Sequence, residues 1–151
     1  MPDPIQLQVI QKMKEVFEAA APGTVALTGL SCLLGPATSR GGKSVVLSIL
    51  TPSGTYDERL ASSKVDRNMQ TEFRCLAYAP RGVEPLERAA QVLADVEEIV
   101  VENETWGGLA IQTRLGAYEI IVEDTADRLV DVTLFATVTY RTRRDDPRNQ
   151  S

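Results

Sequence analysis

Four consecutive residues, Gly41-Gly42-Lys43-Ser44, could form the end of a phosphate-binding loop of the Walker A type. Such a loop needs a glycine five residues before its last glycine, and it opens a helix whose N-terminal N–H groups stabilise phosphate charge. Ala37 holds that position, and residues 45–50 read Val-Val-Leu-Ser-Ile-Leu, which is typical of a β-strand. We therefore favour a loop with a flexible glycine pair over nucleotide binding.

Two groups of carboxylates could in principle do acid–base or metal chemistry. Asp124, Asp127 and Asp131 lie between two predicted strands, and five acidic residues lie between positions 95 and 104. Paired carboxylates can act as acid and base, and hard divalent cations bind several carboxylate oxygens. The second group lacks the Asp-x-Asp-x-Asp-Gly spacing of a calcium loop. We interpret the first group as turn residues and the second as solvated surface or a subunit contact.

The missing residue types narrow the chemistry further. The chain has no histidine, so it contains no Ser-His-Asp triad, no Cys-His dyad and no His-ligated zinc. Cys32 and Cys75 are too few for a four-cysteine zinc site and too far apart for a Cys-x-x-Cys redox motif. Both lie in strand-like segments, and we expect buried free thiols in a reducing compartment rather than a disulfide. We expect no enzymatic activity, no metal and no cofactor.

Length, composition and charge fit one small domain. Of the 151 residues, 43% are hydrophobic and 25% are charged, as in ordinary globular proteins. The formal net charge of −5 argues against a dedicated nucleic-acid-binding surface. No apolar segment approaches the ~20 residues of a membrane span, and no signal-peptide core opens the chain. We expect a single domain, residues 1–151, of a soluble intracellular protein without a membrane contact.

Two helices follow from apolar residues at spacings of three and four. They are predicted over residues 4–20, with Asp3 as the N-cap, and over residues 84–98. The face of the second helix that we expect to be buried comprises Leu86, Ala89, Ala90, Leu93 and Val96.

Strands are predicted where β-branched or alternating apolar residues occur, over residues 24–34, 44–50, 70–79, 117–123 and 132–140. Residues 51–69 show no period, so we expect a long extended loop, which in a compact domain is usually functional or disordered. The tail, residues 141–151, is expected to be flexible. This order predicts an α+β fold, with a single mixed or antiparallel sheet of about four to five strands packed against two main helices.

Two further features could contact a partner. Arg141, Arg143 and Arg144 belong to a basic cluster that could touch phosphates, but two aspartates interrupt it and no aromatic residues are interleaved for base stacking. Binding of an acidic protein surface by this tail is an equally good interpretation. Trp106 could anchor an interface, because tryptophan is enriched at interface hot spots, or it could cover the edge of the core.

The C-terminal part of the chain resembles a known family. Residues 104–110 read Glu-Thr-Trp-Gly-Gly-Leu-Ala, a strand follows around residues 116–123, and residues 131–142 read Asp-Val-Thr-Leu-Phe-Ala-Thr-Val-Thr-Tyr-Arg-Thr before a closing Asp145-Asp146-Pro147. This succession is similar to the tail-terminator (minor tail, tail-completion) proteins of long-tailed bacteriophages. The N-terminal half agrees with that family only in the order of its elements.

The resemblance implies a structural virion protein with an α+β fold and without enzymatic activity or cofactor. Six copies of such a protein close into a hexameric ring that caps the tail tube and ends tail polymerisation. The implied partners are further copies of the chain, the tail tube protein and the head-completion or neck protein, while DNA only passes through the lumen. The implied location is the tail or neck of the virion, assembled in the host bacterial cytoplasm. The alternatives are another neck or connector protein, such as a head-completion or adaptor protein, and a small cytoplasmic enzyme or ligand-binding domain that uses the carboxylates at 124–131.

Closure of a ring needs a heterologous interface, in which different patches of each copy meet head to tail. We expect Arg59, Lys64 and Arg67 on one side to face the acidic segment on the other, because opposite charges fix register and orientation. An acidic balance also suits a pore through which DNA passes, since basic side chains there would hold phosphates. The predicted subunit or partner interface comprises Arg59, Lys64, Arg67, Glu97, Glu98, Glu102, Glu104, Trp106, Arg141, Arg143 and Arg144.

Overall fold

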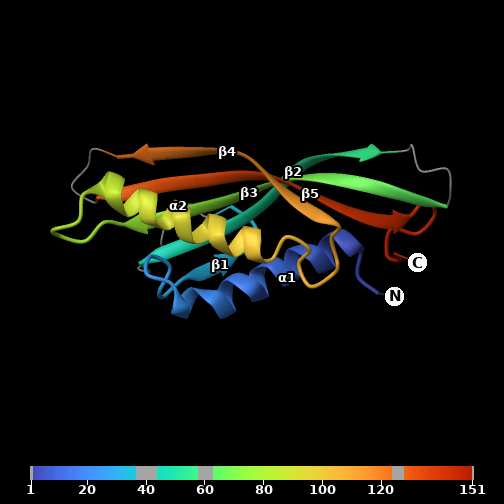
Figure 1. Ribbon diagram of the computed structural model, residues 1–151, viewed down its shortest axis with the longest axis horizontal. Helices are drawn as coiled ribbons and strands as arrows, with labels where there is room; N and C mark the ends of the chain where they lie inside the picture. Colours follow the sequence, from blue (N-terminus) through green and yellow to red (C-terminus); the bar gives the residue numbers. More distant parts are fainter. Residues whose placement is uncertain (1, 37–43, 58–62, 124–127, 151) are drawn as a thin grey trace.

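The computed structural model describes residues 2–36, 44–57, 63–123 and 128–150. Over these residues the chain forms one five-stranded sheet with both α-helices on the same face (Figure 1). This confirms the predicted α+β fold and the predicted order of helices and strands. The elements are α1 (Ile5–Ala20), the short 3-10 helix η1 (Ala21–Gly23), β1 (Ser31–Leu33), β2 (Val45–Asp57), β3 (Lys64–Tyr78), α2 (Pro85–Glu102), β4 (Gln112–Val122) and β5 (Leu129–Arg143).

The sheet has the strand order β1-β2-β3-β5-β4, in which β1 is parallel to β2 and the other neighbours are antiparallel. The central pair, β3 and β5, keeps an unbroken register from Lys64 opposite Arg143 to Tyr78 opposite Leu129. Alternate residues of both strands are buried against the helices, as the alternation of their sequences predicts. The last two strands, β4 and β5, pair antiparallel.

The face of the sheet away from the helices carries polar pairs between β3 and β5. Residues that stand directly opposite each other in the register contact across the strands. Thr139 donates a hydrogen bond to the side-chain oxygen of Asn68 (2.7 Å), and Thr137 donates one to Gln70 (3.2 Å). These pairs satisfy polar side chains on the face that no helix covers in Figure 1.

The largest departure from the sequence prediction concerns residues 51–69, of which the described residues 51–57 and 64–69 form strands and not a loop. β2 continues to Asp57 and β3 begins at Lys64, so most of these residues form the distal part of a long hairpin. Pro52 and Gly54 suggested a loop, but Pro52 lies at a shift of register between Leu50 and Ser53, where an edge strand tolerates proline. β1 pairs only with residues 46–48 of β2, so this distal part is an edge.

The C-terminal segment fastens the beginning of α1. The N-cap of α1 is Pro4 and not Asp3, and no side chain caps the helix. The N–H of Ile5 instead donates to the carbonyl oxygen of Pro147 (3.0 Å). The prediction of a flexible tail from residue 141 is therefore wrong for residues 141–143, which belong to β5, and residue 147 is held by a hydrogen bond.

The predicted buried face of α2 is confirmed at Ala89, Leu93 and Val96 and is wrong at two residues. Leu86 is 63% exposed and Ala90 is also exposed, whereas the helix extends to Glu102, four residues beyond its predicted end. The buried residues of the helix are Ala89, Val92, Leu93, Val96, Ile99 and Val100.

Residues 24–30, predicted as part of a strand, form turns that α2 holds in place. The backbone N–H of Ala26 donates to the carboxylate of Asp95 (2.8 Å), and the guanidinium of Arg88 donates to the carbonyl oxygens of Ala26 (2.7 Å) and Tyr78 (3.1 Å). Burial lowers the pKa of Arg88. Only Ser31–Leu33 of this segment pair with a neighbouring strand.

Three aromatic rings form the centre of the core between sheet and helices. Phe17 of α1, Phe73 of β3 and Trp106 lie with ring centroids 5.5 to 6.2 Å apart, in tilted arrangements. Such contacts add to the free energy of burial. Cys32 and Cys75 are buried free thiols, as predicted.

Candidate assembly surfaces

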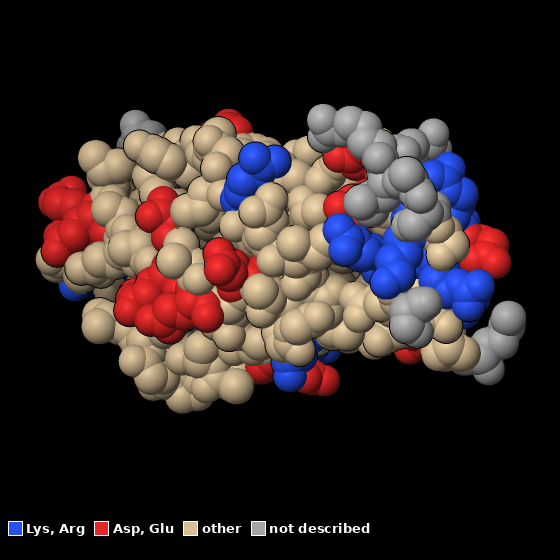
Figure 2. Space-filling model, turned by 45° about the vertical axis from the view of Figure 1, so that its right-hand side comes forward, with Lys and Arg blue, Asp and Glu red and all other residues tan. Residues whose placement is uncertain are grey.

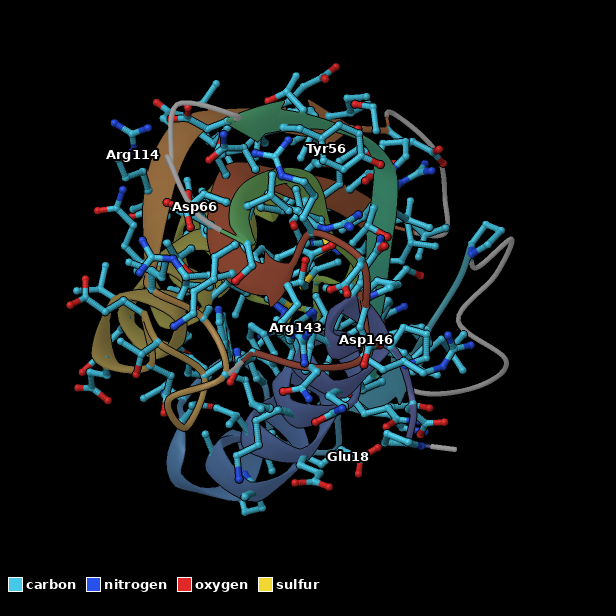
Figure 3. All side chains as sticks on the ribbon, turned by 90° about the vertical axis from the view of Figure 1, so that its right-hand side faces the viewer. Glu18, Tyr56, Asp66, Arg114, Arg143 and Asp146 are labelled. Carbon is cyan, nitrogen blue, oxygen red and sulfur yellow. The ribbon has the colours of Figure 1, made fainter. Side chains whose placement is uncertain are left out.

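Basic side chains gather where the hairpin meets the end of β5. The register places Lys64 opposite Arg143 and Asp66 opposite Arg141. Figure 3 looks at this end of the molecule and shows Tyr56, Asp66 and Arg143 there. Arg59, predicted to belong to this surface, lies outside the described residues. We call Lys64, Arg67, Arg141, Arg143 and Arg144 the basic end.

The arginines of the basic end differ in their contacts. Arg141 forms an ion pair with Asp66 (2.7 Å), whose hydrogen bond and charge raise the pKa of the guanidinium. Arg143 lies 3.4 Å from the carboxylate of Asp145. Arg67 instead donates to the hydroxyl of Thr142 (3.0 Å), and its guanidinium carbon lies 4.9 Å from the centre of the Tyr56 ring. Both of these partners are uncharged, so neither of them neutralises the positive charge of Arg67.

The acidic residues of α2 divide between two sides of the helix. Asp95, Glu98 and Glu102 line a groove of about 300 Å³ beside the end of α1, together with Thr24 and Val25. We call these three carboxylates the acidic groove. It contains two of the predicted interface residues, Glu98 and Glu102.

Glu97 lies on the other side of α2. With 3.6 residues per turn, Glu97 shares a stripe with Leu86 and Val101, about a quarter turn from the buried face and away from α1. Because α2 packs on β5 and also contacts β4, this stripe borders β4. We call Leu86, Glu97 and Val101 the α2 flank. Glu104 follows the helix and is exposed, and its backbone carbonyl accepts a hydrogen bond from Thr113 (2.8 Å).

Figure 2 shows how these charges are distributed. Asp and Glu side chains concentrate toward one end of the visible face, and Lys and Arg side chains toward the other. The basic end belongs to β3, β5 and the residues after them, and most of the acidic residues belong to α2. The two charged sets of the predicted interface therefore lie on separate surfaces of one small domain.

Trp106 cannot take the interface role that was one of its two predicted possibilities. Its side chain is fully buried among Phe17 and Phe73. Its indole N–H donates to the hydroxyl of Thr113 (2.9 Å), which in turn donates to the backbone of Glu104. Trp106 therefore joins the loop after α2 to the core and to the start of β4.

The sites considered for acid–base or phosphate chemistry are only partly described. Of the three carboxylates at 124–131, Asp131 is described: it forms an ion pair with Arg74 (2.6 Å), and its hydrogen bond raises the pKa of that arginine. Asp124 and Asp127 lie outside the described residues, as do Gly41, Gly42 and Lys43. The residues after Ser44 form β2, as predicted, and not the helix that a phosphate-binding loop would open.

Within the described ranges, no three or more His, Cys, Asp or Glu side chains are placed so that they could hold a metal ion. No helix in those ranges is both long and apolar enough to cross a membrane. Burial raises the pKa of the Cys32 thiol to about 12 and also raises that of Cys75.

Two exposed surfaces were missed by the sequence analysis. The first is the distal part of β2, where Tyr56 is 64% exposed and borders a hollow of about 220 Å³ with Arg67 and Tyr140. The second is β4, whose Tyr118 and Ile121 are 62% and 47% exposed. β4 has apolar residues on both of its faces, a pattern that is typical of strands that are covered or paired. From this pattern the sequence could have predicted that β4 contributes to a contact surface.

Comparison with known proteins identifies no relative of the chain: no protein-family model matches it, and no curated protein is significantly similar.

Proposed function

We propose that the chain is a structural protein of a bacteriophage virion, a tail terminator whose copies form a ring on the end of the tail tube. The observation that carries this proposal is the separation of charge, with most acidic residues, those on both sides of α2, toward one end of the molecule and the basic end toward the other. A copy with two complementary surfaces can bind its neighbours head to tail, and such contacts form a ring when the rotation closes. Opposite charges then set the orientation of each copy.

The segments that resemble tail terminators also have defined places in this fold. Gly107 and Gly108, with φ of 72° and 86°, form the turn that leads from α2 to β4. The Asp-Pro segment at the end supplies the carbonyl oxygen of Pro147 that binds the first N–H of α1. These roles are consistent with a shared fold.

In the proposed assembly, one face of the ring binds the tail tube and ends its growth, and the other face receives the head-completion or neck protein. DNA passes through the lumen without a dedicated binding site. The ring is a hexamer, located at the tail or neck of the virion.

Negative-stain electron microscopy of the purified protein, alone and mixed with tail tubes, tests this proposal. We expect discs with a central hole, or tubes that carry a cap at one end and stop growing. Tubes incubated without the protein are the control. Binding to the head vertex instead of the tube would favour another neck or connector protein, and turnover of a small substrate would contradict a structural role.

A further inference from the structure

β4 forms one margin of the sheet, where its edge is protected only by two charged residues, Arg114 and Glu119, and by a shift of register. Within the described residues it pairs with β5 on one side, and no strand pairs with its other side. Native edge strands are usually short, or are blunted by lysine or proline. β4 has 11 residues and contains neither lysine nor proline. After a shift of register at Gly116, residues 117–122 run without a break as Ala-Tyr-Glu-Ile-Ile-Val, a segment of high β-propensity that we call the β4 edge.

The exposed apolar residues of the protein concentrate around this edge. Eleven large hydrophobic side chains are exposed in the described part of the chain, and seven of them lie on β4, just before it or on the α2 flank. Single exposed apolar residues are normal, but their concentration beside one unpaired strand favours a binding surface there. The seven are Leu86, Val101, Ile111, Leu115, Tyr118, Ile121 and Val122.

Toward the opposite margin of the sheet lies the distal part of β2 (residues 51–57), and among the described residues no strand pairs with the outer side of residues 51–56. Figure 3 shows β4 and β2 on opposite sides of the molecule. Each of the pairs β2–β3, β3–β5 and β5–β4 is antiparallel, so β2 and β4 run in opposite directions. A second copy that continues the sheet would therefore place its distal β2 antiparallel to the β4 edge, the arrangement that strand addition commonly uses.

Charge favours this head-to-tail arrangement over a two-fold pairing of β4 with β4. Tyr56 and Arg67 stand opposite each other in the register, and Arg67 lies on the helix-covered face together with Tyr140. The α2 flank, with Glu97, borders β4 on that same face. Continuing the sheet thus brings Arg67 of one copy toward Glu97 of the next, whereas a two-fold contact of β4 with β4 would give Glu97 no such basic partner.

We infer that the β4 edge binds the distal part of β2 of a second copy of this chain as an added antiparallel strand. This inference rests on the proposed assembly into a ring and specifies the contact between its copies. The contact also requires that the second copy be shifted along the strand direction. Within one copy, Gln112 at the start of β4 is level with Thr55 of distal β2, because Gln112 pairs with Thr139, Thr139 with Asn68, and Asn68 with Thr55. The β4 edge therefore lies further toward the other end of the sheet than distal β2 does. Tilted and staggered strands are what a sheet needs in order to close.

Cross-linking between two single-cysteine variants tests the inference. Glu119→Cys places a thiol on the open face of the β4 edge, and Thr55→Cys places one on the same face of distal β2. Cys32 and Cys75 are buried, so the introduced thiol is the reactive one. A short bismaleimide, which spans more than one register, is added to each variant alone and to their mixture at the highest soluble concentration.

We expect covalent dimers in the mixture and none with either variant alone. Dimers of the Glu119→Cys variant alone would show two-fold β4 pairing and overturn the inference, and so would the absence of cross-links in the mixture. The outcomes distinguish this inference from the proposed function. Cross-links in the mixture together with uncapped tubes would contradict the proposed function but not this contact. Capped tubes without cross-links in the mixture would contradict this contact but not the proposed function.

A backbone variant tests strand addition directly. The N–H of Glu123 donates to Leu129 of β5, and hydrogen-bonding residues alternate along an antiparallel strand, so the N–H of Val122 points to the free side. We expect Val122→Pro to lower the yield of mixed cross-links at least about tenfold, while Val122→Ala, which keeps the N–H, retains most of it. Equal yields would contradict strand addition. Should Val122→Pro fail to fold, Ile121→Lys, at a side chain that is 47% exposed, provides the same test.

Discussion

Cys32 and Cys75 keep their protons far above the pH at which free thiols ionise, because burial disfavours the thiolate. The pKa of Cys32 rises from 9.0 to about 12, mainly through burial and further through the charge of Glu18, and the pKa of Cys75 is raised as well. Unreactive, protonated thiols fit the role of small apolar residues in the core.

The raised thiol pKa values predict a loss of stability at alkaline pH. Above about pH 9 the unfolded chain releases these protons while the folded chain keeps them, so the free energy of unfolding falls as the pH rises toward about 12. Urea titrations between pH 8 and the onset of alkaline unfolding measure the slope. In Cys32→Ala the slope should be shallower. An unchanged slope in that variant would assign the effect to other groups, such as Tyr140, whose pKa burial also raises.

Trp106 should be the most costly residue to truncate. Trp106→Ala removes a fully buried indole between Phe17 and Phe73, and we expect a loss of about 3–5 kcal/mol in the free energy of unfolding. Circular dichroism in a urea titration measures it, since the variant lacks the single tryptophan. Thr113→Val, which leaves the buried indole N–H without its acceptor, should cost less, about 1–3 kcal/mol. A loss in Trp106→Ala no larger than in Thr113→Val would contradict this account.

The role of a single residue could be predicted from the sequence where the chemistry of its own side chain determines that role. The burial of both thiols could be predicted, because a cysteine side chain is apolar and each cysteine lies in an apolar segment predicted as a strand. For Trp106 the sequence left two roles open, because a lone tryptophan serves cores and interfaces equally well. The capping role of Asp3 was predicted wrongly, because the N–H of Ile5 is satisfied by Pro147, a partner from the other end of the chain.

At the level of elements, the long hairpin depends on close contact between β2 and β3 at Gly54. A Cβ at this position would lie 2.9 Å from the carbonyl oxygen of Asn68, a backbone atom that cannot move aside cheaply. We expect Gly54→Ala to lower the free energy of unfolding by about 1–3 kcal/mol, measured by urea titration, with faster amide exchange in the hairpin.

Gly116 provides the matched control for this hairpin prediction. It also lies at a shift of register, but a Cβ there would be 3.5 Å from the oxygen of Phe135, an ordinary contact distance. Gly116→Ala should therefore change stability by less than about 1 kcal/mol. Equal effects of the two substitutions would show that the contact with Asn68 does not limit the hairpin.

The same region shows why the elements could be predicted only in part. β3 and β5 alternate clearly, and their strands were predicted in the right places, although too short. Residues 51–57 contain Pro52 and Gly54, which are local signals for a loop, and only the pairing with β3 makes them a strand. Leu86 of the α2 flank was expected to be buried, because it has helical spacing with the other apolar residues of the helix, and sequence does not show on which side of a helix the sheet ends.

At the level of the whole molecule, charge and sheet edges point to the same pair of surfaces. The β4 edge lies beside the α2 flank, and the distal part of β2 lies beside Arg67, so the apolar and the charged contacts would form together. In protein interfaces, buried apolar residues at the centre supply affinity, and charged residues at the rim supply orientation. The sequence predicted the charged residues but not the edges, because an unpaired edge is a property of the strand order.

Reversing the charge of Arg67 should therefore weaken assembly in a salt-dependent way. We expect Arg67→Glu to raise the dissociation constant between copies by about tenfold at low ionic strength, with a smaller difference at high salt, where the wild-type contact is itself screened. Sedimentation velocity over a salt series measures this.

Lys14→Glu is the matched control, because it reverses one charge on α1, where Lys14 lies 3.9 Å from Glu18, away from both surfaces. Adding Glu97→Arg to Arg67→Glu should restore assembly, since the two charges are exchanged across the contact. If Lys14→Glu weakens assembly as strongly, only net charge matters; if the double variant is no better than Arg67→Glu, then Arg67 does not face the α2 flank.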